Sequence, residues 1–264
     1  MTFLGTGTSF GVPVVGCDCE TCESADPRDR RLRHAALIET LAGRRRLLID
    51  TPPELRLQLL GAGVDQVEAV WFTHEHADHT AGIDDLRIFS ARAARPLRAF
   101  AGEACADNLR QRFRYIFDER YRPPAGTTKP EIRLETVQPF EPVEILGLPF
   151  QPLPVPHGDV DAYGFRAGGL GYLTDAQEVP GRVRDSLRGV SVLVLSALWW
   201  GRPHPTHLTV EEALAVAEDI APERCYLVHL THRVRHAALL ERLPDGIEPA
   251  YDGLTVGVPD RGLD

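Results

Sequence analysis

The sequence predicts an α/β fold in which two β-sheets are flanked by helices. The first observation is a mixture of local patterns, because short apolar runs typical of buried strands alternate with segments of helical periodicity. The second is composition, since 264 residues that are 43% hydrophobic can bury a large core. Layered sheets covered by helices accommodate both observations.

Strands are expected at the short apolar runs, which are Ala35–Thr40, Arg46–Asp50, Val67–Phe72, Leu97–Ala101, Glu144–Leu146, Phe150–Val155, Ala162–Ala167, Gly171–Thr174, Ser191–Ser196 and the run Arg224–Val228 around Cys225. Helices are expected at Glu54–Gly61, Gly82–Ala94, Glu103–Phe117, Pro180–Leu187, Glu211–Ile220 and His236–Leu243. The helix that begins at Gly82 is expected to start close to the residues that carry the chemistry.

We expect a single domain over residues 1–264, because layered α/β domains commonly reach this length. The region around 102–140 is predicted to be a variable insert, in which a basic and aromatic helix precedes the loop Tyr121–Gly126. This insert is expected to shape the substrate entrance or to form a homodimer contact.

The sequence has no uninterrupted run of eighteen apolar residues and no basic leader. Neither a membrane span nor export is therefore predicted, and we expect a cytoplasmic protein. The net charge of −9 disfavours a nucleic-acid partner, since long polyanions prefer a basic patch. A small-molecule substrate is expected instead.

Four side chains of metal-ligand type follow the predicted strand Val67–Phe72 within six residues: His74, His76, Asp78 and His79. The first two can face one ion, whereas Asp78 and His79 reach toward a second. Imidazole and carboxylate ligands suit zinc, manganese or iron, and the absence of thiolate argues against a closed structural site. The motif therefore predicts a site for two divalent metals that keeps an open position.

The order His-x-His-x-Asp-His resembles the signature of the metallo-β-lactamase superfamily of metal-dependent hydrolases. The resemblance implies an αββα sandwich of two mixed β-sheets with metals at one edge. It also implies later ligands, which follow short apolar segments at His157, Asp175 and His229. By resemblance, one metal is held by His74, His76 and His157, the other by Asp78, His79 and His229, and Asp175 bridges them.

Each later ligand has an ordinary alternative when taken alone. His157 is compatible with a loop histidine, Asp175 with a cap before Ala176, and His229 with a strand-end histidine bonded to backbone. Their joint order after the main motif favours the ligand interpretation.

Three cysteines, Cys17, Cys19 and Cys22, fall within six residues near the amino terminus. They are too crowded for unstrained internal disulfides and suit a tetrahedral zinc that lacks one ligand. A redox or disulfide cluster is the alternative, but a chain without a secretory start favours metal.

The cysteine motif follows a glycine-rich opening, Leu4–Pro13. Together they resemble the superfamily branch typified by the phosphoribosyl cyclic phosphate phosphodiesterase of the carbon-phosphorus lyase pathway. That branch implies His232 as the fourth ligand of a structural zinc. Such a zinc would join the amino-terminal loop to the end of the strand before His229.

Catalysis needs a nucleophile and a proton donor. Two metals can supply a hydroxide at neutral pH, and the resemblance implies His207 as the general acid, with Asp78 counted beside it as a catalytic ligand. His204 is a weaker alternative, and an exposed loop histidine is the ordinary interpretation of His207. Asp50 resembles the carboxylate that orients a ligand from behind, or it merely begins the turn before Pro52.

These features predict a phosphodiesterase that acts on a small cyclic phosphate or a nucleotide-like diester. Other hydrolases on the same scaffold are alternatives, namely a lactonase, a thioesterase or an RNA 3′-processing nuclease. A non-hydrolytic alternative is an accessory protein similar to the pyrroloquinoline quinone pathway member that shares a cysteine-rich start.

Overall fold

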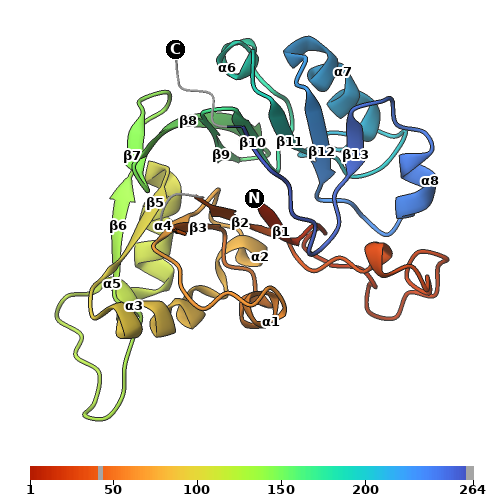
Figure 1. Ribbon diagram of the computed structural model, residues 1–264. Helices are drawn as coiled ribbons and strands as arrows, with labels where there is room; N and C mark the ends of the chain where they lie inside the picture. Colours follow the sequence, from red (N-terminus) through yellow and green to blue (C-terminus); the bar gives the residue numbers. More distant parts are fainter. Residues whose placement is uncertain (41–43, 260–264) are drawn as a thin grey trace.

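The computed structural model describes residues 1–40 and 44–259, and shows two β-sheets packed face to face with helices on both outer sides (Figure 1). The predicted α/β class and the αββα sandwich are confirmed. The predicted domain 1–264 includes residues 41–43 and 260–264, which lie outside the described residues.

The first sheet follows chain order, with β1 (Thr2–Gly5), β2 (Ala35–Glu39), β3 (Arg46–Ile49), β4 (Ala69–Trp71), β5 (Leu97–Ala101) and β6 (Ile132–Thr136). Strands β3 to β6 are parallel, whereas β1 and β2 pair in antiparallel fashion. Its outer face is covered by α1 (Leu55–Gly61), α2 (Ala77–Thr80), the 3-10 turn η2 (Ile83–Leu86), α3 (Arg87–Ala93), α4 (Glu103–Arg112) and α5 (Arg114–Phe117).

The second sheet has the order β13-β12-β11-β10-β9-β8-β7. Its strands are β7 (Val143–Ile145), β8 (Leu148–His157), β9 (Val160–Ala167), β10 (Leu170–Leu173), β11 (Val192–Ser196), β12 (Arg224–Val228) and β13 (Ile247–Pro249). Strands β10 to β13 are parallel. Helices α6 (Gly181–Leu187), α7 (Val210–Ile220) and α8 (His236–Leu240) cover it, and a short turn, η1 (Pro27–Asp29), precedes β2.

Three apolar layers hold the sandwich together. The central layer lies between the sheets and includes Trp71 and Phe100 from the first sheet and Phe165 and Tyr172 from the second. The outer layers join each sheet to its own helices. Burial of apolar surface stabilises the fold by about 25 cal/mol per Å². The packed layers therefore hold the strand ends in fixed positions relative to one another.

Two helix predictions were wrong in detail. The expected helix Gly82–Ala94 begins as the 3-10 turn η2 and continues as α3. The chain is tightly packed at Gly82, where an added Cβ atom would lie 2.2 Å from the Pro52 carbonyl oxygen. The helix next to the ligands is instead α2, which begins at Ala77. The expected helix Glu103–Phe117 breaks at Phe113 into α4 and α5.

The region 102–140 contains more regular structure than an insert requires. Helix α4 buries Cys105 and Leu109 against the first sheet, and β6 pairs with β5. Only the segment 118–131 protrudes as a long loop, at the lower left of Figure 1. Strands β1, β6 and β13 were not predicted, because each is short or only partly buried. No helix formed by the described residues has the length and apolarity needed to cross a bilayer.

Candidate metal centre and active site

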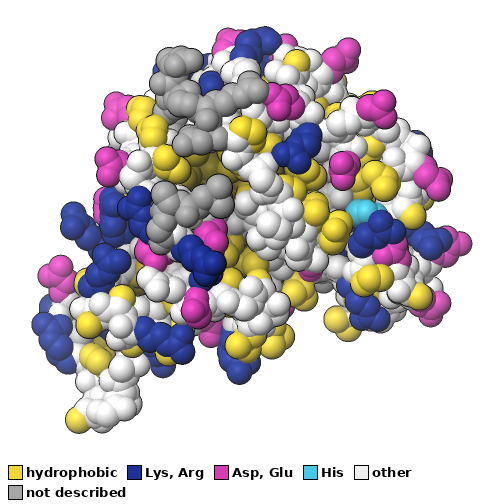
Figure 2. Space-filling view, viewed as in Figure 1, with side chains coloured by type: hydrophobic (Ala, Val, Ile, Leu, Met, Phe, Trp, Pro, Cys, Tyr) yellow, Lys and Arg dark blue, Asp and Glu magenta, His cyan; other side chains and the backbone are white. Residues whose placement is uncertain are grey.

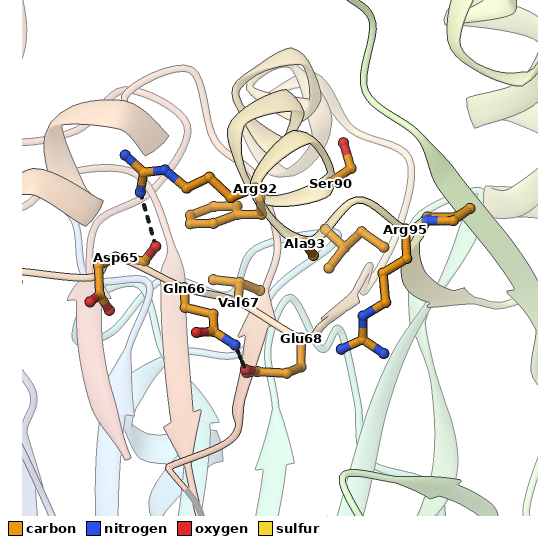
Figure 3. A pocket seen from close by; sticks show the side chains of 11 residues that line it. Asp65, Gln66, Val67, Glu68, Ser90, Arg92, Ala93 and Arg95 are labelled. Carbon is orange, nitrogen blue, oxygen red and sulfur yellow. Dashed lines mark hydrogen bonds between the residues drawn. The ribbon is translucent and has the colours of Figure 1, made fainter.

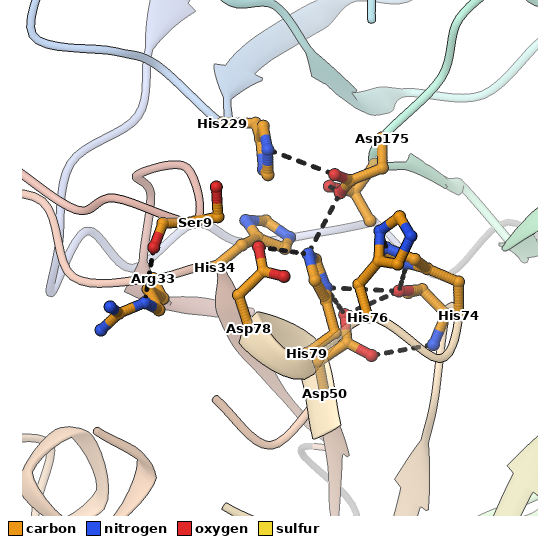
Figure 4. A network of polar contacts seen from close by, with 12 residues as sticks. Ser9, Arg33, His34, Asp50, His74, His76, Asp78, His79, Asp175 and His229 are labelled. Carbon is orange, nitrogen blue, oxygen red and sulfur yellow. Dashed lines mark hydrogen bonds and ion pairs between the residues drawn. The ribbon is translucent and has the colours of Figure 1, made fainter. Parts of the chain in front are cut away.

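The predicted metal ligands gather at one edge of the sandwich, where several strands end. His74 follows β4, His157 ends β8, Asp175 follows β10, and His229 follows β12. Helix α2 adds Asp78 and His79, and Figure 4 shows the side chains pointing toward one another. Ligand sites in layered α/β folds commonly lie at the carboxyl ends of parallel strands.

Three imidazoles converge on one point. The Nε2 atoms of His74 and His157 lie 3.0 and 3.2 Å from Nδ1 of His76. Ligand nitrogens about 2.0–2.1 Å from a tetrahedral ion would be about 3.3 Å apart, so this spacing fits one shared cation. His76 is exposed, whereas His74 and His157 are buried, so the cation would face the solvent on one side.

A second convergence lies beside the first. Nε2 of His79 is 3.5 Å from a carboxylate oxygen of both Asp78 and Asp175, and Nε2 of His229 is 3.2 Å from Asp175. The Nε2 atom of His79 is buried and has no hydrogen-bond partner among the described residues. Such an atom is costly unless an ion satisfies it, and the donor set suits a divalent metal.

Charge is concentrated at this edge. Although burial alone would lower it, the carboxylates of Asp175, Asp50 and Asp78 hold the pKa of His79 well above its usual range. Burial opposes ionisation of Asp175, but the imidazoles of His229 and His79 nevertheless lower the pKa of its carboxyl. Asp175 lies between both groups and is the shared carboxylate of the cluster.

Asp50 holds His79 from behind. Its Oδ2 atom accepts a hydrogen bond from Nδ1 of His79 at 2.7 Å, and its Oδ1 atom accepts one from the Thr73 amide at 2.8 Å. Burial raises the pKa of Asp50, and these donors oppose the rise. A carboxylate in this position fixes the ring orientation of a ligating histidine.

Three residues of the site have left-handed backbone conformations. The φ angles are 61° at Asp50, 56° at Asp175 and 61° at His229, each just after a strand. Non-glycine residues in this region cost about 1–3 kcal/mol each and are typical of functional sites. Asp175 does not cap a helix, since α6 begins only at Gly181.

Sequence reasoning left His34 unassigned. Its buried Nε2 atom lies 2.5 Å from the Tyr172 hydroxyl, and its ring centroid is 6.1 Å from that of His79 and 6.2 Å from that of His229. The pair is separated by 138 residues, and no local motif marks it. The His34 ring therefore lies next to two ligands of the second group, His79 and His229.

His207 lies at the open side of the cluster. Its Nδ1 atom is 3.8 Å from Asp175, and its ring stacks on that of His229 with centroids 4.8 Å apart. Burial lowers the pKa of His207 to about 4. His204 lies farther out, where its Nδ1 atom accepts from Thr206 at 3.3 Å.

The three cysteines surround one histidine nitrogen. The Sγ atoms of Cys17, Cys19 and Cys22 are 3.2, 3.5 and 3.6 Å from Nδ1 of His232, and all three thiols are free. Zn–S bonds of about 2.3 Å and Zn–N bonds of about 2.0–2.1 Å in a tetrahedron would place these atoms about 3.6 Å apart. The four residues therefore fit a zinc site.

A buried arginine, Arg31, connects the segment after the cysteine loop to the residues that follow β12. Arg31 donates to the carbonyl oxygens of Thr231 at 2.7 Å and Val234 at 2.9 Å, and pairs with Asp29 at 3.3 Å. Desolvation lowers the pKa of Arg31, and Asp29 opposes this shift. The loop is thus attached to the β12–α8 segment by a second contact besides the cysteine–histidine cluster.

A separate polar hollow of about 220 Å³ lies near the start of β4 and β5, away from the ligands (Figure 3). Asp65, Glu68, Arg92 and Arg95 are among its lining residues. None of the metal-ligand groups formed by the described residues includes any of them. The candidate metal centre therefore lies outside this hollow, at the edge of the sandwich where the ligands gather.

A family model described as the Beta-lactamase superfamily domain matches residues 45–230, which include every predicted ligand of the two-metal site. The chain belongs to the metallo-β-lactamase superfamily. Its members share this fold, and the fold together with the clustered histidines and aspartates makes the chain a metal-binding hydrolase of that superfamily.

The superfamily assignment agrees with individual relatives. A crystal structure described as a new diphosphatase from the PhnP family is 38% identical, with a TM-score of 0.87, over 96% of this chain and 94% of that one. Zinc-bound PqqB from Methylobacterium extorquens shares the fold at 21% identity, with a TM-score of 0.77 over 97% and 99% of the two chains.

A curated relative from Porphyromonas gingivalis is named octanoyltransferase. It is 38% identical over 98% of this chain, but the chain spans only 52% of that protein. The superfamily member described here therefore corresponds to about half of that relative.

Proposed function

We propose that this superfamily hydrolase is a phosphodiesterase that cleaves a small cyclic phosphate or a nucleotide-like diester. The observation that carries the proposal is the convergence of two ligand groups on Asp175, with His207 3.8 Å from the same carboxylate. The arrangement provides for a nucleophile, charge neutralisation and a proton donor within one site.

Two divalent cations, zinc, manganese or iron, would occupy the groups His74, His76, His157 and Asp78, His79, His229, with Asp175 shared. When bound, such cations lower the pKa of water and neutralise phosphoryl oxygens. One structural zinc would occupy the cluster of Cys17, Cys19, Cys22 and His232. His79 donates a hydrogen bond to the Asp50 carboxylate and His157 donates one to the Thr206 carbonyl oxygen, and these bonds orient the two rings.

The proposed reaction forms a bond from the attacking hydroxide oxygen to phosphorus and breaks the bond from phosphorus to the leaving oxygen. That oxygen needs a proton, and His207 is positioned to donate it through its ring on the open side. Burial lowers the pKa of His207 to about 4, but an arriving phosphoryl anion favours the protonated ring.

The relatives bear on this proposal unequally. The PhnP-family diphosphatase is covered over 94% of its own length, so a diphosphatase activity is relevant to this chain. The name octanoyltransferase belongs to a protein of which this chain spans 52%, so acyl transfer is not carried over. PqqB shares the fold at 21% identity and favours no activity here.

The proposal is tested with a hydrolysis screen of manganese-loaded and zinc-loaded protein. Substrates are cyclic phosphates, linear diesters, diphosphate diesters, lactones and thioesters. The proposal expects turnover of phosphorus esters or anhydrides and none of the acyl esters. Preferential lactone or thioester cleavage would replace it with an alternative hydrolase.

The role of His207 is tested by His207→Ala. We expect kcat for a phosphodiester with a poor leaving group to fall about 100-fold, the lower end of general acid catalysis. Metal content should stay unchanged, and a diester with an acidic leaving group should lose much less. Equal losses for both substrates would contradict proton donation.

We further propose a cytoplasmic location and a small-molecule substrate. Free, clustered thiols suit a reducing compartment. On the face in Figure 2, positive and negative side chains are intermixed, which gives no broad basic surface for nucleic acid there. A homodimer contact through the protruding 118–131 loop stays a proposal.

A further inference from the structure

A pocket of about 450 Å³ opens directly beside the ligand cluster, and its size suits a small organic ligand. His207 and His229 belong to its wall. The rest of the wall comes from three loops at the same edge, which contribute Phe10, Trp199 and Arg233. A substrate held by the metal ligands would therefore extend into this pocket.

The pocket is free of carboxylates among its described lining residues, although the chain carries a net charge of −9. Arg233 is exposed, and its guanidinium lies 4.4 Å above the Trp199 ring. Among the described residues Arg233 forms no ion pair within 4.0 Å. An unpaired cation in a carboxylate-free pocket favours an anionic ligand.

Aromatic surface adjoins this cation. Phe10 is 74% exposed on the turn from Thr8 to Gly11, where the Gly11 amide donates to the Thr8 carbonyl at 2.9 Å. The Trp199 indole donates to the Arg202 carbonyl at 2.8 Å, which fixes its ring. The exposed Phe10 ring provides stacking surface for a planar group, and the half-buried Trp199 ring, with Arg233 over it, adds an aromatic edge to the same pocket.

We propose that the pocket formed by Phe10, Trp199 and Arg233 binds the nucleotide part of the substrate. The base contacts the two aromatic rings, the non-reacting phosphate lies against Arg233, and the scissile phosphorus lies at the ligand cluster. This inference rests on the proposed function and narrows its substrate class to esters of a nucleoside diphosphate.

Binding is measured by titration calorimetry of the metal-loaded protein with ADP and with ribose 5-phosphate. Wild type should bind ADP at least tenfold more tightly, because stacking of one base contributes roughly that factor or more. Phe10→Ala should weaken ADP binding about tenfold and leave ribose 5-phosphate unchanged. Arg233→Gln should weaken ADP binding by a similar factor.

The chain offers a matched control for each variant. Val15 is 99% exposed in the same amino-terminal region and does not line the pocket. Arg242 lies 4.0 Å above the ring of Trp200, outside the pocket, and repeats the contact of Arg233 with Trp199. Val15→Ala and Arg242→Gln should leave ADP binding unchanged.

Equal affinity for ADP and ribose 5-phosphate would overturn the inference, as would unchanged ADP binding in both pocket variants. These results would leave phosphodiester hydrolysis untouched. Conversely, ADP binding that depends on Phe10 and Arg233 in a protein that cleaves no phosphorus ester would uphold the nucleotide site and disprove the proposed function.

Discussion

The histidine–aspartate cluster and the cysteine–histidine cluster lie close together, since His229 and His232 are three residues apart, yet they are built differently. Ligands of the first are mostly buried at strand ends, and several have a hydrogen bond on the side away from the cluster. Those of the second are half-buried on two loops, and in the cysteine loop Cys22 accepts a backbone hydrogen bond from Val14.

This difference predicts that metal loss has different effects at the two clusters. The packed sheets position the first cluster before any ion binds, so removing its ligands should affect catalysis more than folding. The cysteine loop should depend on the proposed zinc for part of its order, because binding energy at a structural zinc is folding energy. The following predictions test this contrast, from the largest expected effect to the smallest.

Asp175→Asn should produce the largest effect. Loss of the shared carboxylate removes stabilisation worth several kcal/mol, so turnover should fall about 10³-fold. Because a polar side chain of the same size stays in place, the melting temperature should change little. Calorimetry and steady-state kinetics check both results, and a large loss of stability with retained turnover would contradict the contrast.

Asp50→Asn should have an intermediate effect. The amide oxygen can still accept a hydrogen bond from Nδ1 of His79, but the NH₂ group then faces the Thr73 amide, which is itself a donor. Metal affinity or activity should therefore fall about 10–100-fold. Asp65→Asn is the control, since that carboxylate pairs with Arg46 at the surface, 80% exposed. Similar losses in both variants would show that Asp50 does not act through His79.

Cys19→Ser should have the smallest effect on turnover and a measurable one on stability. Removal of a thiolate should release one zinc per chain and lower the melting temperature by about 5 °C, which corresponds to a loss of about 2 kcal/mol in a domain of this size. Cys225→Ser is unsuitable as a control because that thiol is buried. Ser24→Ala serves instead, since it removes from the same region a hydroxyl that, among the described residues, only accepts a hydrogen bond from the Asp26 amide and ligates nothing. Unchanged zinc content would disprove the assignment.

Part of this site could be predicted because its ligands are close in sequence. His74 to His79 form one local motif, and the same holds for Cys17 to Cys22. His157, Asp175 and His229 are far from that motif in the sequence, and the packing of the two sheets brings them next to it. Only the family resemblance linked them to the motif. The contact of His34 with Tyr172 spans 138 residues and left no local pattern.

The strands and helices could likewise be predicted only in part from the sequence. The strand Leu97–Ala101 is apolar except for the exposed Arg98, and the structure reproduces its predicted bounds. The expected helix at Gly82 starts within one residue of its predicted position, but its first turn is a 3-10 turn, and the close approach of Gly82 to Pro52 is a tertiary contact that helical periodicity does not encode. Strand β6 does alternate apolar and charged residues, Ile-Arg-Leu-Glu-Thr, so a usable strand signal was present there that the prediction missed.

Metal stoichiometry tests the central claim most directly. Elemental analysis of purified wild type, His76→Ala and Cys19→Ser should give three divalent metals per chain in wild type. Cys19→Ser should lose only zinc, and His76→Ala should lose active-site metal while keeping the thiolate-bound zinc. A wild-type chain that holds one zinc, released only by Cys19→Ser, would contradict the two-metal hydrolase and favour a non-hydrolytic accessory protein.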